Sequence, residues 1–134
     1  KEVQHAFDND LSFHSTEFNF RSLQHDVLGA LIVQKWGISP VVEKTTRWHH
    51  TVKKSQRIGV EDPNIHKLID LIKLANHIIK EIEFGNSGYR VKLNLDPEFL
   101  RRRKMDDQEL QNCKEVVKEA LEAEAEHLAI FSKE

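Results

Sequence analysis

Histidine and carboxylate side chains gather at the two ends of one stretch of the sequence, between Ser22 and His50. His25 and Asp26 are adjacent near its start, and His49 and His50 are adjacent at its end. Imidazole and carboxylate groups bind divalent metal ions such as iron, manganese and zinc, and a bound metal can activate a water molecule. These four residues are therefore the candidates for a metal site.

The sequence between the two pairs predicts a helical hairpin with a break at Gly-Ile-Ser-Pro. With a rise of about 1.5 Å per residue, antiparallel helices bring both pairs to the same end of the hairpin. Adjacent helical residues point about 100° apart, so we expect only one member of each pair to face a common ion. The site would then have two protein ligands, fewer than the three that are usual in catalytic zinc sites. Alternatively, these polar residues only tie the helix ends together through hydrogen bonds.

The rest of the pattern predicts an all-α fold, a helical bundle. Apolar residues recur at spacings of three and four, and capping residues mark the helix starts. The predicted starts are Ser22, Ser39-Pro40, Asp62-Pro63, Asp96-Pro97 and Asp106-Asp107, and the predicted ends include Gly37 and Gly85. We expect the hairpin to pack against the helix over residues 62–83 and the C-terminal helix to cover its open side. Residues 86–95 are interpreted as a loop. The basic segment 53–59 is interpreted as a solvated loop, with a phosphate or anion contact as the alternative.

Composition limits the classes of protein and partner. The 134 residues correspond to one domain, and the net charge of −2 gives no electrostatic case for binding nucleic acid. The basic run over residues 101–104 has no interleaved aromatic side chains to stack on bases. The single cysteine, Cys113, excludes an intrachain disulfide and fits the reducing cytoplasm. No apolar run reaches the roughly 18 residues that span a bilayer, so we expect a cytoplasmic protein that does not bind membranes.

The chain resembles the HDOD family, a helical signalling branch of the HD phosphohydrolase superfamily. The resemblance rests on His-Asp-x-x-Gly-Ala-Leu-Ile-x-x-x-Trp-Gly-Ile-Ser-Pro, followed by Trp-His-His and Leu-Ala-Asn-His. It covers the later half of the family domain, and we assign residues 18–105 to it and residues 106–134 to a C-terminal helix. The matched residues are His25, Gly29, Ala30, Trp36, Pro40, His49, His50, Leu74 and Ala75.

Two departures from the family pattern bear on catalysis. The metal-binding His-Asp-Ile-Gly-Lys segment of the superfamily has no counterpart before His25, and His25-Asp26 aligns with a later histidine instead. Asn76 stands where the Leu-Ala-Asp motif has its aspartate, and a neutral amide is a poorer metal ligand than a carboxylate. The resemblance therefore implies that His25, His49 and His50 are metal-site positions of a vestigial kind, with no catalytic residues and no resident cofactor.

The resemblance implies a non-catalytic signal-transduction or regulatory module, of the kind found in bacterial signalling, that binds a signalling protein. The alternative is a metal-dependent phosphohydrolase of the HD superfamily that uses iron, manganese or zinc. The C-terminal helix, over residues 107–131, is alanine-rich and acidic towards its end, which suits an exposed or dimer-forming helix. We therefore also consider a homodimer formed through this helix.

Overall fold

The computed structural model describes residues 5, 8–9, 16–17, 24–84 and 94–124, and every regular element among them is helical. This confirms the all-α class predicted from the sequence. Contacts divide the chain into two compact units, residues 1–94 and residues 95–134, which are described separately. The expected loop over residues 86–95 lies outside the described residues, apart from Asn94 and Leu95.

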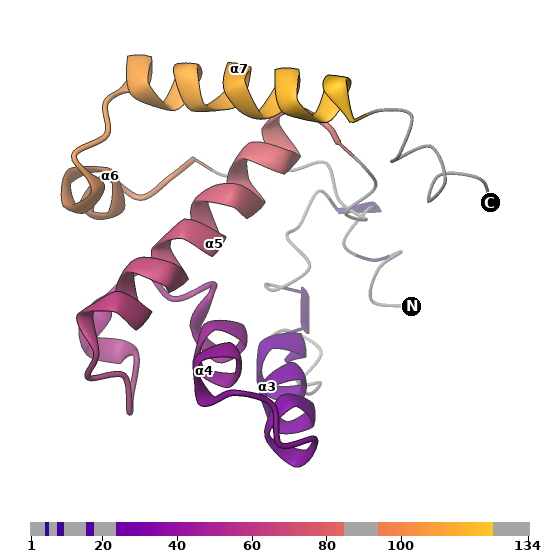
Figure 1. The fold of residues 1–134 in the computed structure, drawn as a ribbon, viewed down its shortest axis with the longest axis vertical. Helices are drawn as coiled ribbons and strands as arrows, with labels where there is room; N and C mark the ends of the chain where they lie inside the picture. The colour runs from indigo at the N-terminus through magenta and orange to yellow at the C-terminus, as the bar shows by residue number, and fades with distance from the viewer. Residues whose placement is uncertain (1–4, 6–7, 10–15, 18–23, 85–93, 125–134) are drawn as a thin grey trace. The chain divides into compact units, whose positions relative to one another are not determined.

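The first unit contains the predicted hairpin, formed by α3 (His25–Lys35) and α4 (Pro40–Trp48), which lie side by side in Figure 1. Gly37 has a φ of +66°, the left-handed conformation expected of a residue that ends a helix. The Ser39 side chain accepts a hydrogen bond from the Val41 backbone N–H, and Pro40 occupies the first turn, as predicted. The predicted start at Ser22 is wrong, because α3 begins at His25 and Gln24 is its N-cap.

A short 3₁₀ helix, η1 (Lys54–Gln56), leads to the long helix α5 (Pro63–Glu81), which contacts α4 (Figure 1). Asp62 caps α5 by accepting a hydrogen bond from the Asn64 backbone N–H at 2.8 Å. Ile69 and Ile78 are buried on α5, whereas Leu68 and Ile72 of the same apolar pattern are each 37% exposed. The helix ends at Glu81 rather than at Gly85, and Glu83 adopts a positive φ of 54° beyond its end.

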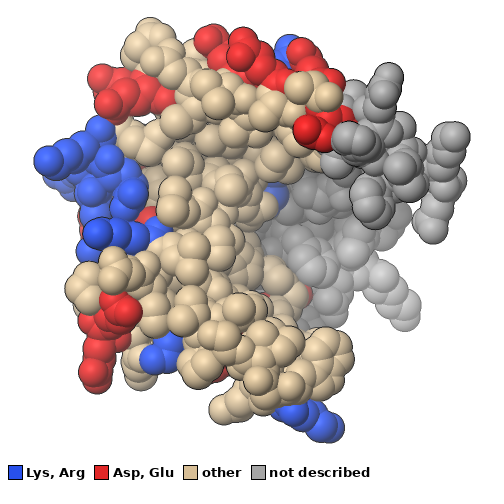
Figure 2. Space-filling view, in the orientation of Figure 1, with Lys and Arg blue, Asp and Glu red and all other residues tan. Residues whose placement is uncertain are grey.

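The second unit contains α6 (Pro97–Arg103) and α7 (Asp107–Ala123), both capped by the aspartates predicted from the sequence. Asp106 and Glu109 form a reciprocal capping box at the start of α7. Figure 2 shows acidic side chains gathered over α7 and basic side chains over α6. Within α6, Arg102 lies 3.5 Å from Glu98 and over the Phe99 ring, so part of the basic run is paired locally.

Several large apolar side chains of the hairpin remain exposed. Trp36 is 72% exposed, and Leu31 is 52% exposed on the same helix–turn segment. Exposed apolar surface of this kind marks interaction sites in many proteins. No helix in the described part of the chain is both long enough and apolar enough to cross a membrane.

Candidate metal centre

The three histidines predicted at the ends of the hairpin come together in space. His25 Nε2 lies 3.4 Å from His49 Nε2 and 3.0 Å from His50 Nε2. One ring nitrogen from each residue falls within 4.8 Å of the other two, and each residue is half-buried. Among the described residues, these three form the group with the spacing of metal ligands.

His49 and His50 both lie in the cluster, whereas the prediction had only one member of each pair facing a common ion. That prediction assumed a helix running through both residues, whereas α4 ends at Trp48 with His49 as its C-cap. His50 follows in a turn that is closed by a hydrogen bond from the Thr51 backbone N–H to the Trp48 carbonyl oxygen. The rings of His49 and His50 lie 4.0 Å apart, centroid to centroid, and both belong to the cluster.

A glycine sets the separation of the two helices close to the cluster. A Cβ atom added at Gly29 would lie 2.8 Å from Cγ2 of Thr46. Gly29 is one turn after His25, and Thr46 is about one turn before His49 and His50. The absence of a side chain at position 29 therefore lets α3 and α4 approach closely enough for the three rings to meet.

The outer nitrogens of two rings have fixed hydrogen-bond partners. His25 Nδ1 lies 2.6 Å from Oε2 of Glu17, whose side chain is 4% exposed, and His49 Nδ1 lies 2.7 Å from the Thr46 carbonyl oxygen. Carboxylate and carbonyl oxygens only accept, so these partners assign the proton to Nδ1 of each ring. In the neutral rings, the Nε2 atoms of His25 and His49 then carry lone pairs that face each other.

This arrangement fits a divalent metal by two physical criteria. Metal-bound histidines almost always donate their other ring N–H to a carboxylate, a carbonyl or water, which is the pattern of His25 and His49. Nitrogens about 2.0–2.1 Å from a tetrahedral zinc lie about 3.3–3.4 Å apart, which matches the 3.4 Å between the Nε2 atoms of His25 and His49, whereas the 3.0 Å between those of His25 and His50 is shorter.

Asp26, the fourth candidate, is directed elsewhere. One of its carboxylate oxygens accepts from the Val27 backbone N–H at 2.8 Å, and the other accepts from Arg47 at 2.6 Å. This agrees with the prediction that His25 and Asp26 cannot both face one ion. Asn76, the other residue compared with the family's ligands, lies on α5 and is half-buried.

The segment after His50 is held by a buried ion pair that the sequence reading missed. Arg57 is 2% exposed, and it donates to the Thr51 carbonyl and, at 2.6 Å, to the Asp70 carboxylate. Lys73 of α5 donates to the His50 carbonyl at 3.2 Å. The prediction of a solvated basic loop over residues 53–59 is therefore wrong at Arg57, although residues 53–56 are exposed.

His66 lies beside this ion pair and outside the cluster. Its pKa is lowered from the ordinary value of 6.5, first because burial disfavours the imidazolium and then because Arg57 and Lys54 are positively charged. His66 Nδ1 lies 3.4 Å from the guanidinium of Arg57. The neutral ring is therefore the form that suits this environment.

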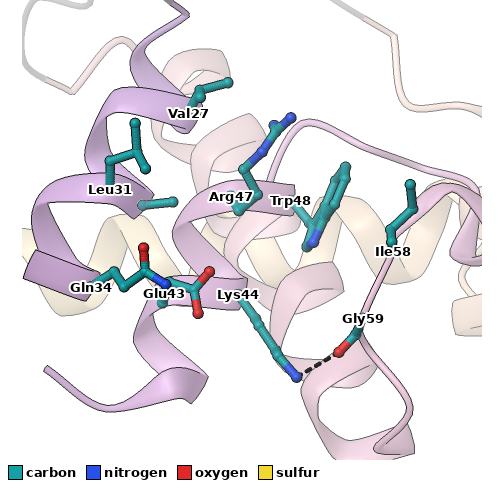
Figure 3. Close-up of a pocket in the computed structure, with 10 residues that line it drawn as sticks. Val27, Leu31, Gln34, Glu43, Lys44, Arg47, Trp48, Ile58 and Gly59 are labelled. Carbon is teal, nitrogen blue, oxygen red and sulfur yellow. Dashed lines mark hydrogen bonds between the residues drawn. The ribbon is translucent and has the colours of Figure 1, made fainter. Parts of the chain in front are cut away.

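The hairpin also carries a hollow of about 570 Å³ on the face formed by α3, α4 and the loop at residues 58–59 (Figure 3). Its lining is mainly apolar, with Leu31 and Trp48 among the contributing side chains. Its two cations are bound to the protein, since Lys44 donates to the Gly59 carbonyl and Arg47 to Asp26. The hollow also carries the carboxylate of Glu43, and its lining does not include the three histidines of the cluster.

Comparisons with protein-family models, with curated proteins and with solved structures find no match for this chain. The resemblance to the HDOD family, carried by the residues of the hairpin, therefore stays a proposal.

Proposed function

We propose that this chain is a metal-binding helical domain in which His25, His49 and His50 hold one divalent cation. The observation that carries the proposal is the convergence of three imidazole nitrogens, two of them on rings whose outer nitrogens are already hydrogen-bonded. Three protein ligands leave room for a further ligand such as water. The 38% exposure of the His25 side chain supports access of solvent to one side of the site.

The donor set favours some metals over others. Imidazole nitrogen suits zinc and iron, whereas manganese and magnesium prefer carboxylate and carbonyl oxygen. The nearest described carboxylate, that of Glu17, binds the outer side of the His25 ring. We therefore propose zinc or ferrous iron as the cation, ahead of manganese.

For the biological role, we propose a regulatory module of the HDOD type without catalysis of its own. The support is the resemblance together with the environment of Asp26, whose carboxylate binds Arg47 instead of joining the cluster. The metal would then hold the start of α3 and the end of α4 in one geometry, and a signalling protein would recognise that geometry. Self-association through α7 is part of this proposal, since its Val116 side chain is 64% exposed.

The second candidate is a metal-dependent phosphohydrolase of the HD superfamily. The open side of the three-histidine site favours it, because a bound cation there could polarise a phosphate or lower the pKa of a bound water. Hydrolysis of p-nitrophenyl phosphate by the iron-loaded or zinc-loaded chain distinguishes the two candidates. Turnover that is lost in His25→Ala would favour the enzyme, and absence of turnover in a metal-loaded chain would favour the regulatory module.

Metal binding itself is tested by calorimetric titration of the metal-free chain with zinc. We expect one zinc per chain and loss of binding in His49→Ala. His66→Gln is the matched control, because His66 lies in the same unit but outside the cluster, and it should bind as the unsubstituted chain does. Equal zinc binding by His49→Ala and the unsubstituted chain would contradict the proposal.

A further inference from the structure

Glu17 lies eight residues before His25 and is among the most buried charged residues described, with 3% of its surface exposed. Both of its carboxylate oxygens contact His25. Oε1 accepts from the His25 backbone N–H at 3.0 Å, and Oε2 accepts from the ring Nδ1 at 2.6 Å. One side chain therefore fixes both the backbone and the ring of a proposed metal ligand.

The backbone contact explains how α3 begins without a capping side chain of its own. Gln24 is the N-cap residue, and its side chain makes no capping hydrogen bond. Glu17 satisfies the first N–H of the helix from outside it, and a negative charge is favourable at a helix N-terminus. The carboxylate thereby places His25 at a defined position in the first turn.

The ring contact decides which nitrogen faces the cluster. With the proton of His25 held on Nδ1 by the carboxylate, Nε2 carries the lone pair and points towards His49 and His50. A carboxylate bound to a ligand histidine orients the ring and increases its strength as a ligand. It also places a negative charge near a cation whose three ligands are otherwise neutral.

We infer that Glu17 is a positioning residue of the metal site, which presents His25 Nε2 to the cation and sets the affinity of the site. This inference rests on the proposed metal-binding function. Outer partners of this kind change metal affinity by roughly 10–100-fold when they are removed. Glu17→Gln should therefore weaken zinc binding by that factor.

Asp26 provides a matched control at the next position along the chain from His25. Like Glu17, Asp26 is 3% exposed and accepts from one backbone N–H at the start of α3. Its second partner is the guanidinium of Arg47, where Glu17 has the imidazole of His25. Neither of these two contacts of Asp26 involves a ring of the histidine cluster. Asp26→Asn therefore reproduces the loss of a buried carboxylate at the same helix end without the loss of a bond to a metal ligand.

The test uses the full chain, titrated with zinc by calorimetry and with cobalt by visible absorption. We expect Glu17→Gln to bind zinc roughly 10–100-fold more weakly and to show a changed cobalt spectrum. Asp26→Asn should lower the melting temperature while its zinc affinity and cobalt spectrum stay as they are. Equal affinities of Glu17→Gln and the unsubstituted chain, or an equal loss in Asp26→Asn, would overturn the inference. Absence of zinc binding by the unsubstituted chain would instead overturn the proposed function.

A second measurement needs no substitution. Nitrogen-15 NMR of the metal-free chain, at a pH where the rings are neutral, reports which nitrogen of each imidazole carries the proton. We expect the His25 proton on Nδ1 because of its bond to Glu17. A proton on Nε2 of His25 would overturn the inference even if Glu17→Gln fails to fold.

Discussion

Gly29→Ala tests whether the close approach of α3 and α4 builds the site. Alanine is a better helix former than glycine by about 0.8–1.0 kcal/mol, so the substitution would stabilise an unobstructed helix. Here the new Cβ would lie 2.8 Å from Thr46 Cγ2, a contact that forces the helices or the Thr46 side chain to move. Overpacking of this kind typically costs about 1–3 kcal/mol. We therefore expect a net loss of up to about 2 kcal/mol in the free energy of unfolding.

Thr46→Ser separates the two effects, because it removes the methyl group that the new Cβ would meet. In that background, Gly29→Ala should stabilise the chain by about 0.8–1.0 kcal/mol, the helix-propensity gain alone. Urea unfolding of the four proteins gives the coupling between the two positions. Equal effects of Gly29→Ala in both backgrounds would refute the close-approach argument.

The same four proteins test the link from packing to metal binding. A displacement of α4 moves Thr46, whose carbonyl holds the His49 ring, relative to His25 on α3. Gly29→Ala should therefore weaken zinc binding, and adding Thr46→Ser should restore it. If Gly29→Ala destabilises the chain but leaves calorimetric zinc affinity unchanged, the helix separation does not set the ligand geometry.

Three further outcomes follow from contacts in the first unit. Asp70→Ala leaves Arg57 buried without its carboxylate and should destabilise the chain by about 3–5 kcal/mol in urea unfolding, whereas Arg57→Met combined with Asp70→Leu should cost less. Asp62→Ala removes the N-cap of α5 and should lower the free energy of unfolding by about 0.5–2 kcal/mol. The pKa of His66 is lowered in the folded state, so its contribution to stability is present above pH 6.5 and is lost as the pH falls through the folded pKa. Between pH 8 and pH 5, the His66→Gln variant should therefore lose less free energy of unfolding than the unsubstituted chain does.

The helix starts were the part of the fold that the sequence predicted best. Ser39, Asp62 and Asp106 each accept a backbone hydrogen bond two or three residues further along the chain. Such caps depend on residues close in sequence, so their patterns are visible without a structure. The start of α3 was predicted wrongly because its cap comes from Glu17, eight residues before the first helical residue.

The predicted meeting of histidines at one end of the hairpin is found in the structure, but with three rings instead of two. His25, His49 and His50 were expected at one end of the hairpin, and the structure brings all three rings together. The spacing suggested two ligands because it treated His49 and His50 as helical, whereas α4 ends at Trp48. A helix end is the least determined feature of a periodic pattern, and here it lies next to two of the three rings.

Long-range polar contacts were the part that the sequence could not indicate. Arg57 resembles any exposed basic loop residue in the sequence, but it binds Asp70, thirteen residues away, in the interior. Glu17 binds His25, eight residues further along the chain. Both pairings depend on the packing of elements that are separate in sequence, so neither composition nor periodicity contains them.

X-ray absorption spectroscopy of the zinc-loaded chain tests the central claim most directly, because it reports the atoms bound to the metal. We predict imidazole scattering from three nitrogens at about 2.0–2.1 Å, with loss of one imidazole in His50→Ala. Sulfur scattering at about 2.3 Å would place the metal at the free thiol of Cys113. That result, or a shell of oxygen ligands without imidazole, would contradict a metal centre built from His25, His49 and His50.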